Sequence, residues 1–348
     1  MKILIVKVSA LGDIIHALPV LAYLHSCSPT MTIDWLVEES FATPLEGHPL
    51  ISKVCSINTK EWRRQGLLRV VKGFGKTIRR LRQKKYDVVL DLQGNSKSGF
   101  FTLFSGAPLR YGFDAHGARE WPNTLATNRK VGKKKELIHI TEQNISIAAE
   151  AFPGGKTRLL QGPLQASPLC HEPVEKKLQN IDLGNGPVVI CHYGTTWKTK
   201  LWAIDQWQEL LQSLWQTRTI TPLLTWGNEE ELAAVQEIAA GCRHAVIWPR
   251  GSLGEFIALL ERADLVVGGD TGPIHLAAAL GTATVSYFRA TDSRRNGPRG
   301  PEHICLQAAK TCSPCLQRTC PQDNECRHSI LPAAMLQAIN TLLDKQDS

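Results

Sequence analysis

Three polar side chains, Asp270, Thr271 and His275, fall within residues 265–281, LVVGGDTGPIHLAAALG. The β-branched residues before them favour a short buried strand. The proline after Gly272 suits the first position of a helix, where its missing N–H costs nothing. The N–H groups and positive end of such a helix attract anions. The sequence therefore predicts an anion site here, and the alternative is a polar turn without a ligand.

A second polar group follows the strand-like residues 188–193. In the sequence HYGTTWKTKLW, Thr195 and Thr196 supply hydroxyls and Lys200 an ammonium. Two hydroxyls and a cation at the end of a strand suit the oxygens of a diphosphate. The alternative is a solvated loop with an ordinary lysine.

Carboxylates at two places in the sequence could either bind substrate or only stabilise a helix. In WGNEEE, Glu231 or its neighbour Glu230 could accept hydrogen bonds from a ribose diol. Spacing alone favours an acidic first helical turn instead, because carboxylates stabilise that end. Asp13 follows a glycine at a predicted helix start, where it is either a cap or a general base for an acceptor hydroxyl.

Basic residues cluster in the first half of the chain. They form either a solvated helix face or a patch that meets an anionic acceptor or membrane leaflet. Nucleic acid is not expected as a partner, because no recognition motif accompanies the charge. The residues are Arg63, Arg64, Lys72, Lys76, Arg79, Arg80, Arg82, Lys84 and Lys85.

Four cysteines lie close together before the last predicted helix: Cys312, Cys315, Cys320 and Cys326. Four thiolates can hold a structural zinc ion, although the spacing is not that of two C-x-x-C knuckles. Free thiols that pack a loop are the alternative reading. No catalytic metal site is predicted.

The chain has 348 residues, 43% of them hydrophobic, and a formal net charge of +8. The length indicates two domains, and the charge favours anionic partners. Lys7 and Asp13 interrupt the apolar N-terminus, so we expect no signal peptide. Ten cysteines without such a signal indicate a reducing compartment. No stretch is expected to span a bilayer.

Strand-like and helix-like segments alternate along the chain, which indicates α/β domains with parallel sheets. Strands are predicted at 2–8, 33–37, 53–57, 86–92, 188–193, 221–226, 245–248, 265–269 and, as the last, 284–287. Helices are predicted at 14–25, 70–85, 139–152, 204–216, 229–240, 253–262, 274–279 and 330–343. The organisation expected is a domain at 1–165, a linker at 166–186, a second domain at 187–328 and a C-terminal segment at 329–348 that packs back on the first domain.

Several of these segments resemble one known family. KVSALGDIIHALP, TTWKTKLW and GGDTGPIHLAAALG resemble the ADP-heptose:lipopolysaccharide heptosyltransferases. IDWLVEESF and DLQGNSKSG look most like its heptosyltransferase I members. The resemblance implies a GT-B fold, in which two Rossmann-like doubly wound α/β domains face a central cleft. It also implies inverting, metal-independent transfer without a cofactor, from ADP-heptose to a Kdo residue of Kdo-lipid A.

The same resemblance implies roles for individual residues. Asp13 matches the catalytic base, and Arg63, Arg64 and Lys97 match basic positions on the acceptor side. The donor positions matched are Thr195, Thr196, Lys200, Glu231, Asp270, Thr271, Gly272 and His275. The resemblance further implies a cytoplasmic location, in peripheral contact with the cytosolic face of the anionic inner membrane. Heptosyltransferase II-type transfer to a heptose, or a non-catalytic nucleotide-sugar-binding module, are the alternatives.

Overall fold

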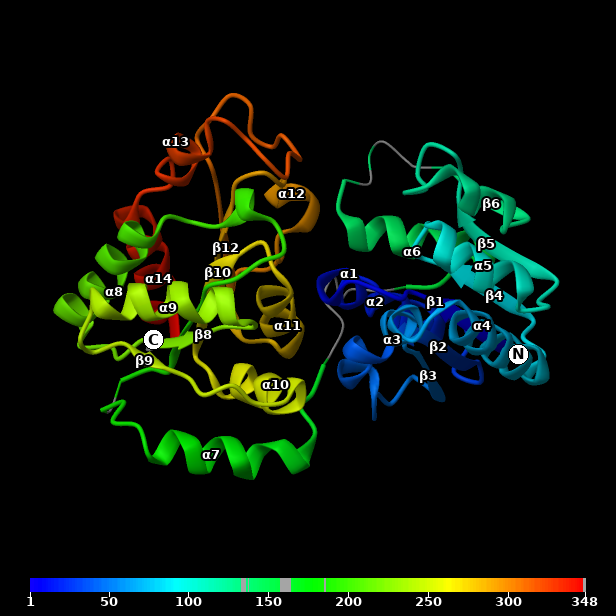
Figure 1. Cartoon of the computed structure of the whole chain (residues 1–348), viewed down its shortest axis with the longest axis horizontal. Helices are drawn as coiled ribbons and strands as arrows, with labels where there is room; N and C mark the ends of the chain where they lie inside the picture. The colour runs from blue at the N-terminus through cyan, green and yellow to red at the C-terminus, as the bar shows by residue number, and fades with distance from the viewer. Residues whose placement is uncertain (133–135, 137, 157–163, 185, 347–348) are drawn as a thin grey trace. The chain divides into compact units, whose positions relative to one another are not determined.

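The computed structural model describes residues 1–132, 136, 138–156, 164–184 and 186–346. The chain divides into two compact units, Met1–Pro163 and Leu164–Ser348 (Figure 1). Residue 185 of the predicted linker and residues 347–348 of the predicted C-terminal segment lie outside the described residues.

Unit 1 is built on a six-stranded sheet in the order β3-β2-β1-β4-β5-β6, and every neighbouring pair is parallel. This order is typical of nucleotide-binding Rossmann domains. The inner strands are continuous apolar runs because helices cover both faces of such a sheet. The strands are β1 (Lys2–Val6), β2 (Thr32–Glu38), β3 (Lys53–Ile57), β4 (Val88–Asp91), β5 (Leu109–Phe113) and β6 (Arg129–Val131).

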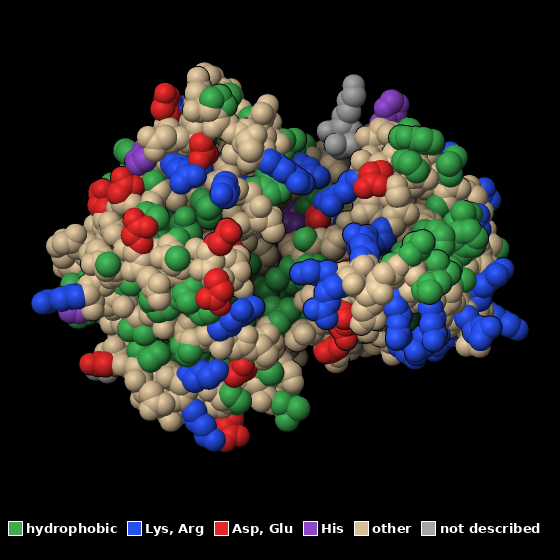
Figure 2. Space-filling model, viewed as in Figure 1, with side chains coloured by type: hydrophobic (Ala, Val, Ile, Leu, Met, Phe, Trp, Pro, Cys, Tyr) green, Lys and Arg blue, Asp and Glu red, His purple; other side chains and the backbone are tan. Residues whose placement is uncertain are grey.

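The helices of unit 1 include one that the sequence analysis placed incorrectly. The predicted helix at 14–25 is two helices, because Pro19 has no N–H to continue the first one. Figure 2 shows Lys and Arg side chains crowded over α4. The helices are α1 (Leu11–Ile15), α2 (Pro19–Cys27), α3 (Thr59–Arg64), α4 (Leu67–Lys84), α5 (Ser96–Phe104) and α6 (Ile140–Ala151), with short 3₁₀ turns η1 (Glu39–Phe41), η2 (Thr43–Leu45) and η3 (Trp121–Leu125).

Unit 2 repeats the architecture with a parallel sheet in the order β12-β11-β10-β7-β8-β9. Residues 284–287, predicted to be the last strand, lie in β11, and a further strand, β12, follows them. The prediction that the chain has no later strand is therefore wrong. All five residues of β12 are only half-buried at the sheet edge, so they lack the apolar pattern of an inner strand. The strands are β7 (Val189–His192), β8 (Leu223–Thr225), β9 (Val246–Ile247), β10 (Leu265–Gly269), β11 (Ala283–Phe288) and β12 (His303–Gln307).

The helices and 3₁₀ turns of unit 2 begin before its first strand and end after its last one. The helices are α7 (His171–Gln179), α8 (Ile204–Arg218), α9 (Glu229–Ala240), α10 (Leu253–Arg262), α11 (Gly272–Leu280), α12 (Ser293–Asn296), α13 (Asp323–Arg327) and α14 (Pro332–Gln346). The turns are η4 (Pro168–Cys170) and η5 (Lys198–Lys200). Across the described ranges, no helix has the length and apolarity that a membrane span needs.

Two expectations about these helices are wrong. Residues 166–186 are not simply a linker, because α7 lies there and its Lys177 Nζ is 2.8 Å from Glu255 Oε1 on α10. The C-terminal helix packs into the core of unit 2. Met335 and Ile339 of α14 are fully buried in the same core as Trp207 of α8. Apolar contact with α8 and β11 therefore decides its position.

Candidate active site

The anion site predicted in unit 2 contains a buried charge cluster. Because β7 and β10 are parallel neighbours, the segments that follow them meet at one edge of the sheet. Lys200 Nζ from η5 lies 2.7 Å from Asp270 Oδ2, just after β10, and 3.2 Å from the Asp270 carbonyl oxygen. His275 Nε2 on α11 lies 3.0 Å from Asp270 Oδ1. Three predicted donor residues are thus brought together.

Asp270 is the anionic centre of this cluster, with only 4% of its surface exposed. Burial by itself raises the pKa of this carboxyl. The hydrogen bond with His275 and the ammonium of Lys200 outweigh burial, so the pKa of Asp270 lies well below its ordinary value. The carboxylate is therefore ionised at neutral pH and holds Lys200 and His275 in place.

Other residues predicted to bind the donor lie in the segments that follow β7 and β10, at the same edge of the sheet. Thr271 is the N-cap of α11 and Gly272 is its first residue, and both are half-buried. Thr195, half-buried, and Thr196, exposed, lie in the loop that joins β7 to η5. The start of α11 thus combines helix N–H groups, hydroxyls and an ammonium at one sheet edge. Such a combination can bind phosphate oxygens.

The structure also distinguishes Glu231 from Glu230. The Glu231 carboxylate accepts a 2.7 Å hydrogen bond from the N–H of Gly227, just after β8. A Cβ added to Gly194, after β7, would lie 2.4 Å from that carboxylate. Burial raises the pKa of Glu231, whereas Glu230 is exposed. Glu231 is therefore the carboxylate placed at the strand ends.

Asp13 in unit 1 lies in α1, the helix that follows β1. Ala10 is the N-cap of α1 and Asp13 is its third residue, so Asp13 is not the cap. Its Oδ2 accepts a long, 3.4 Å hydrogen bond from the N–H of Ala10 and lies 2.7 Å from Arg119 Nη2. Burial acts to raise the pKa of Asp13, but Lys7 and Arg119 outweigh it and lower the pKa. Asp13 is thus an ionised carboxylate at the carboxyl edge of the sheet, paired with Arg119.

Of the three residues predicted on the acceptor side, only Lys97 lies at the same sheet edge as Asp13. Lys97 is the second residue of α5, which follows β4, and its Nζ lies 2.6 Å from Glu38 Oε1 at the end of β2. Arg63 and Arg64 lie exposed on α3, where Arg64 pairs with Glu61 at 2.9 Å. Among the contacts of the described residues, none joins these two arginines to Lys97 or Asp13. Lys97 therefore belongs to the sheet edge of Asp13, and the two arginines stay separate basic groups.

Two comparisons decide the family. A sequence model of glycosyltransferase family 9 (heptosyltransferase) matches residues 74–325. Lipopolysaccharide heptosyltransferase 1 of Pseudomonas aeruginosa is 33% identical over 325 residues, which cover 92% of this chain and 87% of that protein. The chain belongs to glycosyltransferase family 9. The resemblance found in the sequence is thereby confirmed.

Further relatives of this family 9 glycosyltransferase agree. Lipopolysaccharide heptosyltransferase 1 of Escherichia coli K12 is 29% identical over 311 residues, 89% of this chain and 94% of that protein. The structure of E. coli heptosyltransferase WaaC with ADP has a TM-score of 0.79 and 26% identity over 98% of this chain and 100% of that one. E. coli ADP-heptose lps heptosyltransferase II, 21% identical over the full length of both chains, shares the fold with a TM-score of 0.78. The predicted GT-B class of two Rossmann-like domains is confirmed.

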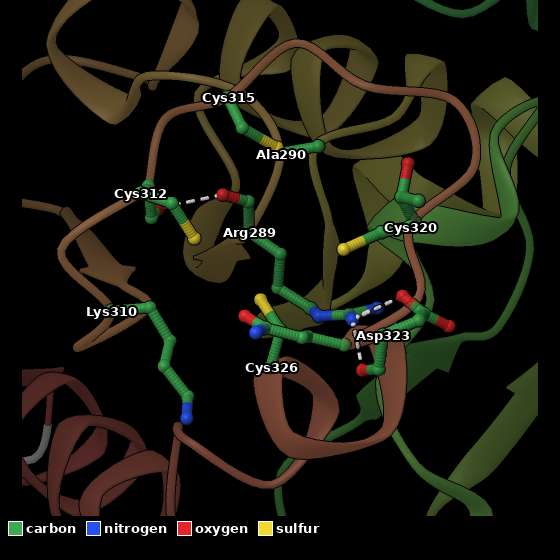
Figure 3. Close-up of a pocket in the computed structure, with 11 residues that line it drawn as sticks. Arg289, Ala290, Lys310, Cys312, Cys315, Cys320, Asp323 and Cys326 are labelled. Atoms are coloured by element: carbon green, nitrogen blue, oxygen red, sulfur yellow. Dashed lines mark hydrogen bonds and ion pairs between the residues drawn. The ribbon is translucent and has the colours of Figure 1, made fainter.

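Four of the ten cysteines line a small cavity in unit 2 (Figure 3). Cys312, Cys315, Cys320 and Cys326 surround Arg289, whose guanidinium is fully buried and lies 2.6 Å from Asp323 Oδ1. All four thiols are free. In the described part of the chain, no three His, Cys, Asp or Glu side chains are arranged to hold a metal ion. The loop is instead fixed by Arg289 and by a 2.6 Å hydrogen bond from Thr199 Oγ1 to the Gln317 carbonyl.

Sequence reasoning missed several charged neighbours of the site. Arg119 pairs with Asp13, and Glu38 pairs with Lys97. Arg318 lies with its Cζ 4.9 Å from the ring of Trp197, the ring that also lies 5.0 Å from Lys200 Nζ. A charged residue after a strand is the signal that could have identified Glu38. Arg119 and Arg318 come from loops without a motif.

His192, the last residue of β7, is a buried histidine, and we expect its titration to make the stability of the fold sensitive to acid. Its Nδ1 lies 2.9 Å from Thr225 Oγ1, and burial lowers its pKa from 6.5 to about 4. Between these two values the unfolded chain binds a proton that the folded chain does not. The free energy of unfolding therefore falls as the pH drops from 6.5 to 4, by about 3 kcal/mol for a shift of this size.

We expect His192→Asn to remove this part of the pH dependence, because asparagine does not titrate. Urea unfolding at pH 7 and pH 4 measures it, with the exposed His25→Asn as the matched control. A parental pH slope in His192→Asn would show that His192 is protonated in the folded protein.

Proposed function

We propose that this glycosyltransferase transfers L-glycero-D-manno-heptose from ADP-heptose to a Kdo residue of Kdo-lipid A, with inversion at the anomeric carbon. The observation that carries the proposal is the buried cluster of Lys200, Asp270 and His275 at the start of α11. The relatives named lipopolysaccharide heptosyltransferase 1 support the sugar and the class of acceptor. The structures of E. coli WaaC with ADP and with ADP-2-deoxy-2-fluoro heptose support the donor.

The donor half of the reaction belongs to unit 2. Lys200, Thr195, Thr196 and the N–H groups that begin α11 bind the diphosphate, and Glu231 accepts hydrogen bonds from the ribose. As the bond between the anomeric carbon and the phosphate oxygen breaks, negative charge develops on ADP. The ammonium and the positive helix end stabilise that charge. In this proposal a metal ion is not needed, so a chelator should leave the rate unchanged.

The acceptor half belongs to unit 1. Asp13 accepts the proton of the Kdo hydroxyl while that oxygen forms its bond to the anomeric carbon, on the face opposite the departing ADP. Protonated Asp13 then returns its proton to solvent. Lys97, Arg63 and Arg64 attract the anionic acceptor. Peripheral contact with the cytosolic face of an anionic inner membrane completes the proposal.

The deciding experiment offers the purified protein ADP-heptose with one of two acceptors. We expect a heptosylated product, identified by mass spectrometry, from Kdo-lipid A and none from an acceptor that already carries the first heptose. Transfer only to the second acceptor would support the heptosyltransferase II-type activity instead. ADP-heptose binding without any product would favour a binding module. Restoration of the first heptose in a strain that lacks it tests the same function in cells.

A further inference from the structure

Large apolar side chains project into solvent from α4 and α5 of unit 1. On the first turns of α4, Leu67, Leu68 and Val71 are 78%, 87% and 64% exposed. On α5, Phe100, Leu103 and Phe104 are each about two-fifths exposed. We call these six residues the α4–α5 apolar surface. Most large apolar side chains of this chain are buried instead, so their concentration on two neighbouring helices needs an explanation.

Aromatic contacts join the two halves of this surface. The ring of Phe74 on α4 lies 4.9 Å from that of Phe100, which in turn lies 4.7 Å from Phe104. Trp121 and Leu125 of η3, which packs on α5, add two further exposed apolar side chains at 68% and 69%. Figure 2 shows the resulting hydrophobic area over α5, next to the basic side chains of α4. The exposed rings of α5 therefore form one cluster with Phe74, which lies one helical turn after Val71 on α4.

The charge around this surface has a single sign. Residues 60–85 contain one acidic residue, Glu61, and all of their Lys and Arg side chains are exposed. These are Lys60, Arg63, Arg64, Arg69, Lys72, Lys76, Arg79, Arg80, Arg82, Lys84 and Lys85. A basic helix with an apolar face is typical of segments that lie in the interface of an anionic bilayer.

We infer that the α4–α5 apolar surface docks unit 1 on an anionic lipid bilayer, with its apolar side chains inserted and the surrounding cations on the headgroups. A second copy of this chain is a poorer occupant. Pairing two such surfaces would bring their like charges together, and charge of one sign opposes self-association. Anionic lipid complements both the charge and the apolar side chains.

Docking at this place would bring the acceptor site to the membrane. α3 and α5 begin at the carboxyl ends of β3 and β4, the sheet edge that also carries Asp13 and Lys97. A lipid-linked acceptor would therefore reach Asp13 without leaving the bilayer. The inference rests on the membrane contact of the proposed function and names the surface that makes it, and vesicle binding tests that surface separately from heptose transfer.

Flotation with vesicles tests the inference on the full chain. We expect binding to vesicles of phosphatidylethanolamine and phosphatidylglycerol, and at least tenfold weaker binding to vesicles of phosphatidylcholine alone. The double variant Leu67→Ser with Leu68→Ser should lose at least tenfold in binding to the anionic vesicles. Leu169→Ser, an equally exposed leucine of unit 2, is the matched control and should bind as the parent does.

Parental vesicle binding by the Leu67→Ser, Leu68→Ser variant would overturn the inference. A second outcome would also overturn it: the parent is a dimer by analytical ultracentrifugation, and the variant is a monomer that binds vesicles as the parent does. Transfer to a detergent-dispersed acceptor is measured in parallel and should stay parental, because neither leucine is part of the proposed site. Absent transfer together with intact vesicle binding would contradict the proposed function alone.

Discussion

Asp13→Asn should lower the rate of heptose transfer by about 10²–10⁴-fold, the usual contribution of a general base. Asparagine keeps the size of the side chain and the hydrogen bond with the N–H of Ala10, but it cannot take the acceptor proton. The affinity for ADP should not change, because the residues proposed to bind the donor belong to unit 2. Product formation by mass spectrometry and ADP affinity by calorimetry measure the two effects separately.

The matched control for Asp13 is Asp87→Asn. Asp87 is an exposed carboxylate before β4, at the opposite, amino-terminal edge of the same sheet, where it accepts a 2.7 Å hydrogen bond from the N–H of Lys2. Its removal should leave the transfer rate unchanged. If Asp13→Asn, folded as judged by circular dichroism, turned over at the parental rate, Asp13 would not be the base.

Lys200→Ala should weaken ADP binding by about 10- to 100-fold, since hydrogen bonds to charged groups contribute about 1.5–3 kcal/mol each. It should also lower the free energy of unfolding by about 3 kcal/mol, because it leaves the buried Asp270 carboxylate without its ammonium. His275 still holds that carboxylate, so we expect the lower end of the range for broken buried pairs. Calorimetry with ADP and urea unfolding measure the two losses.

A second variant separates binding from folding. Lys200→Ala combined with Asp270→Asn removes both charges, so stability should recover while ADP binding stays weak. Lys198→Ala, an exposed lysine two residues earlier in η5, should change neither quantity. Parental ADP affinity in Lys200→Ala would remove this lysine from the donor site and, with it, the electrostatic basis of the proposed function.

Much of the donor site was predictable because its residues are local. The segment 265–281 encodes its own strand, turn and helix, and β10 and α11 form there. Thr195, Thr196 and Glu231 follow predicted strands, so a parallel sheet had to place them at its carboxyl edge. The α/β class and the alternation of elements in both halves follow from the same local patterns. The family motifs add the chemistry that such positions perform.

Only the tertiary structure decided which charges meet. Lys200 pairs with Asp270 across 70 residues of sequence, and Arg119 pairs with Asp13 across 106. Such pairs depend on the order of strands in the sheet, which local periodicity does not encode. The same limit explains β12, a half-buried edge strand without an apolar pattern, and the packing of α14 against α8. The α4–α5 apolar surface could not be predicted either. Its leucines and phenylalanines have the sequence pattern of core residues, and only the fold shows that they are exposed.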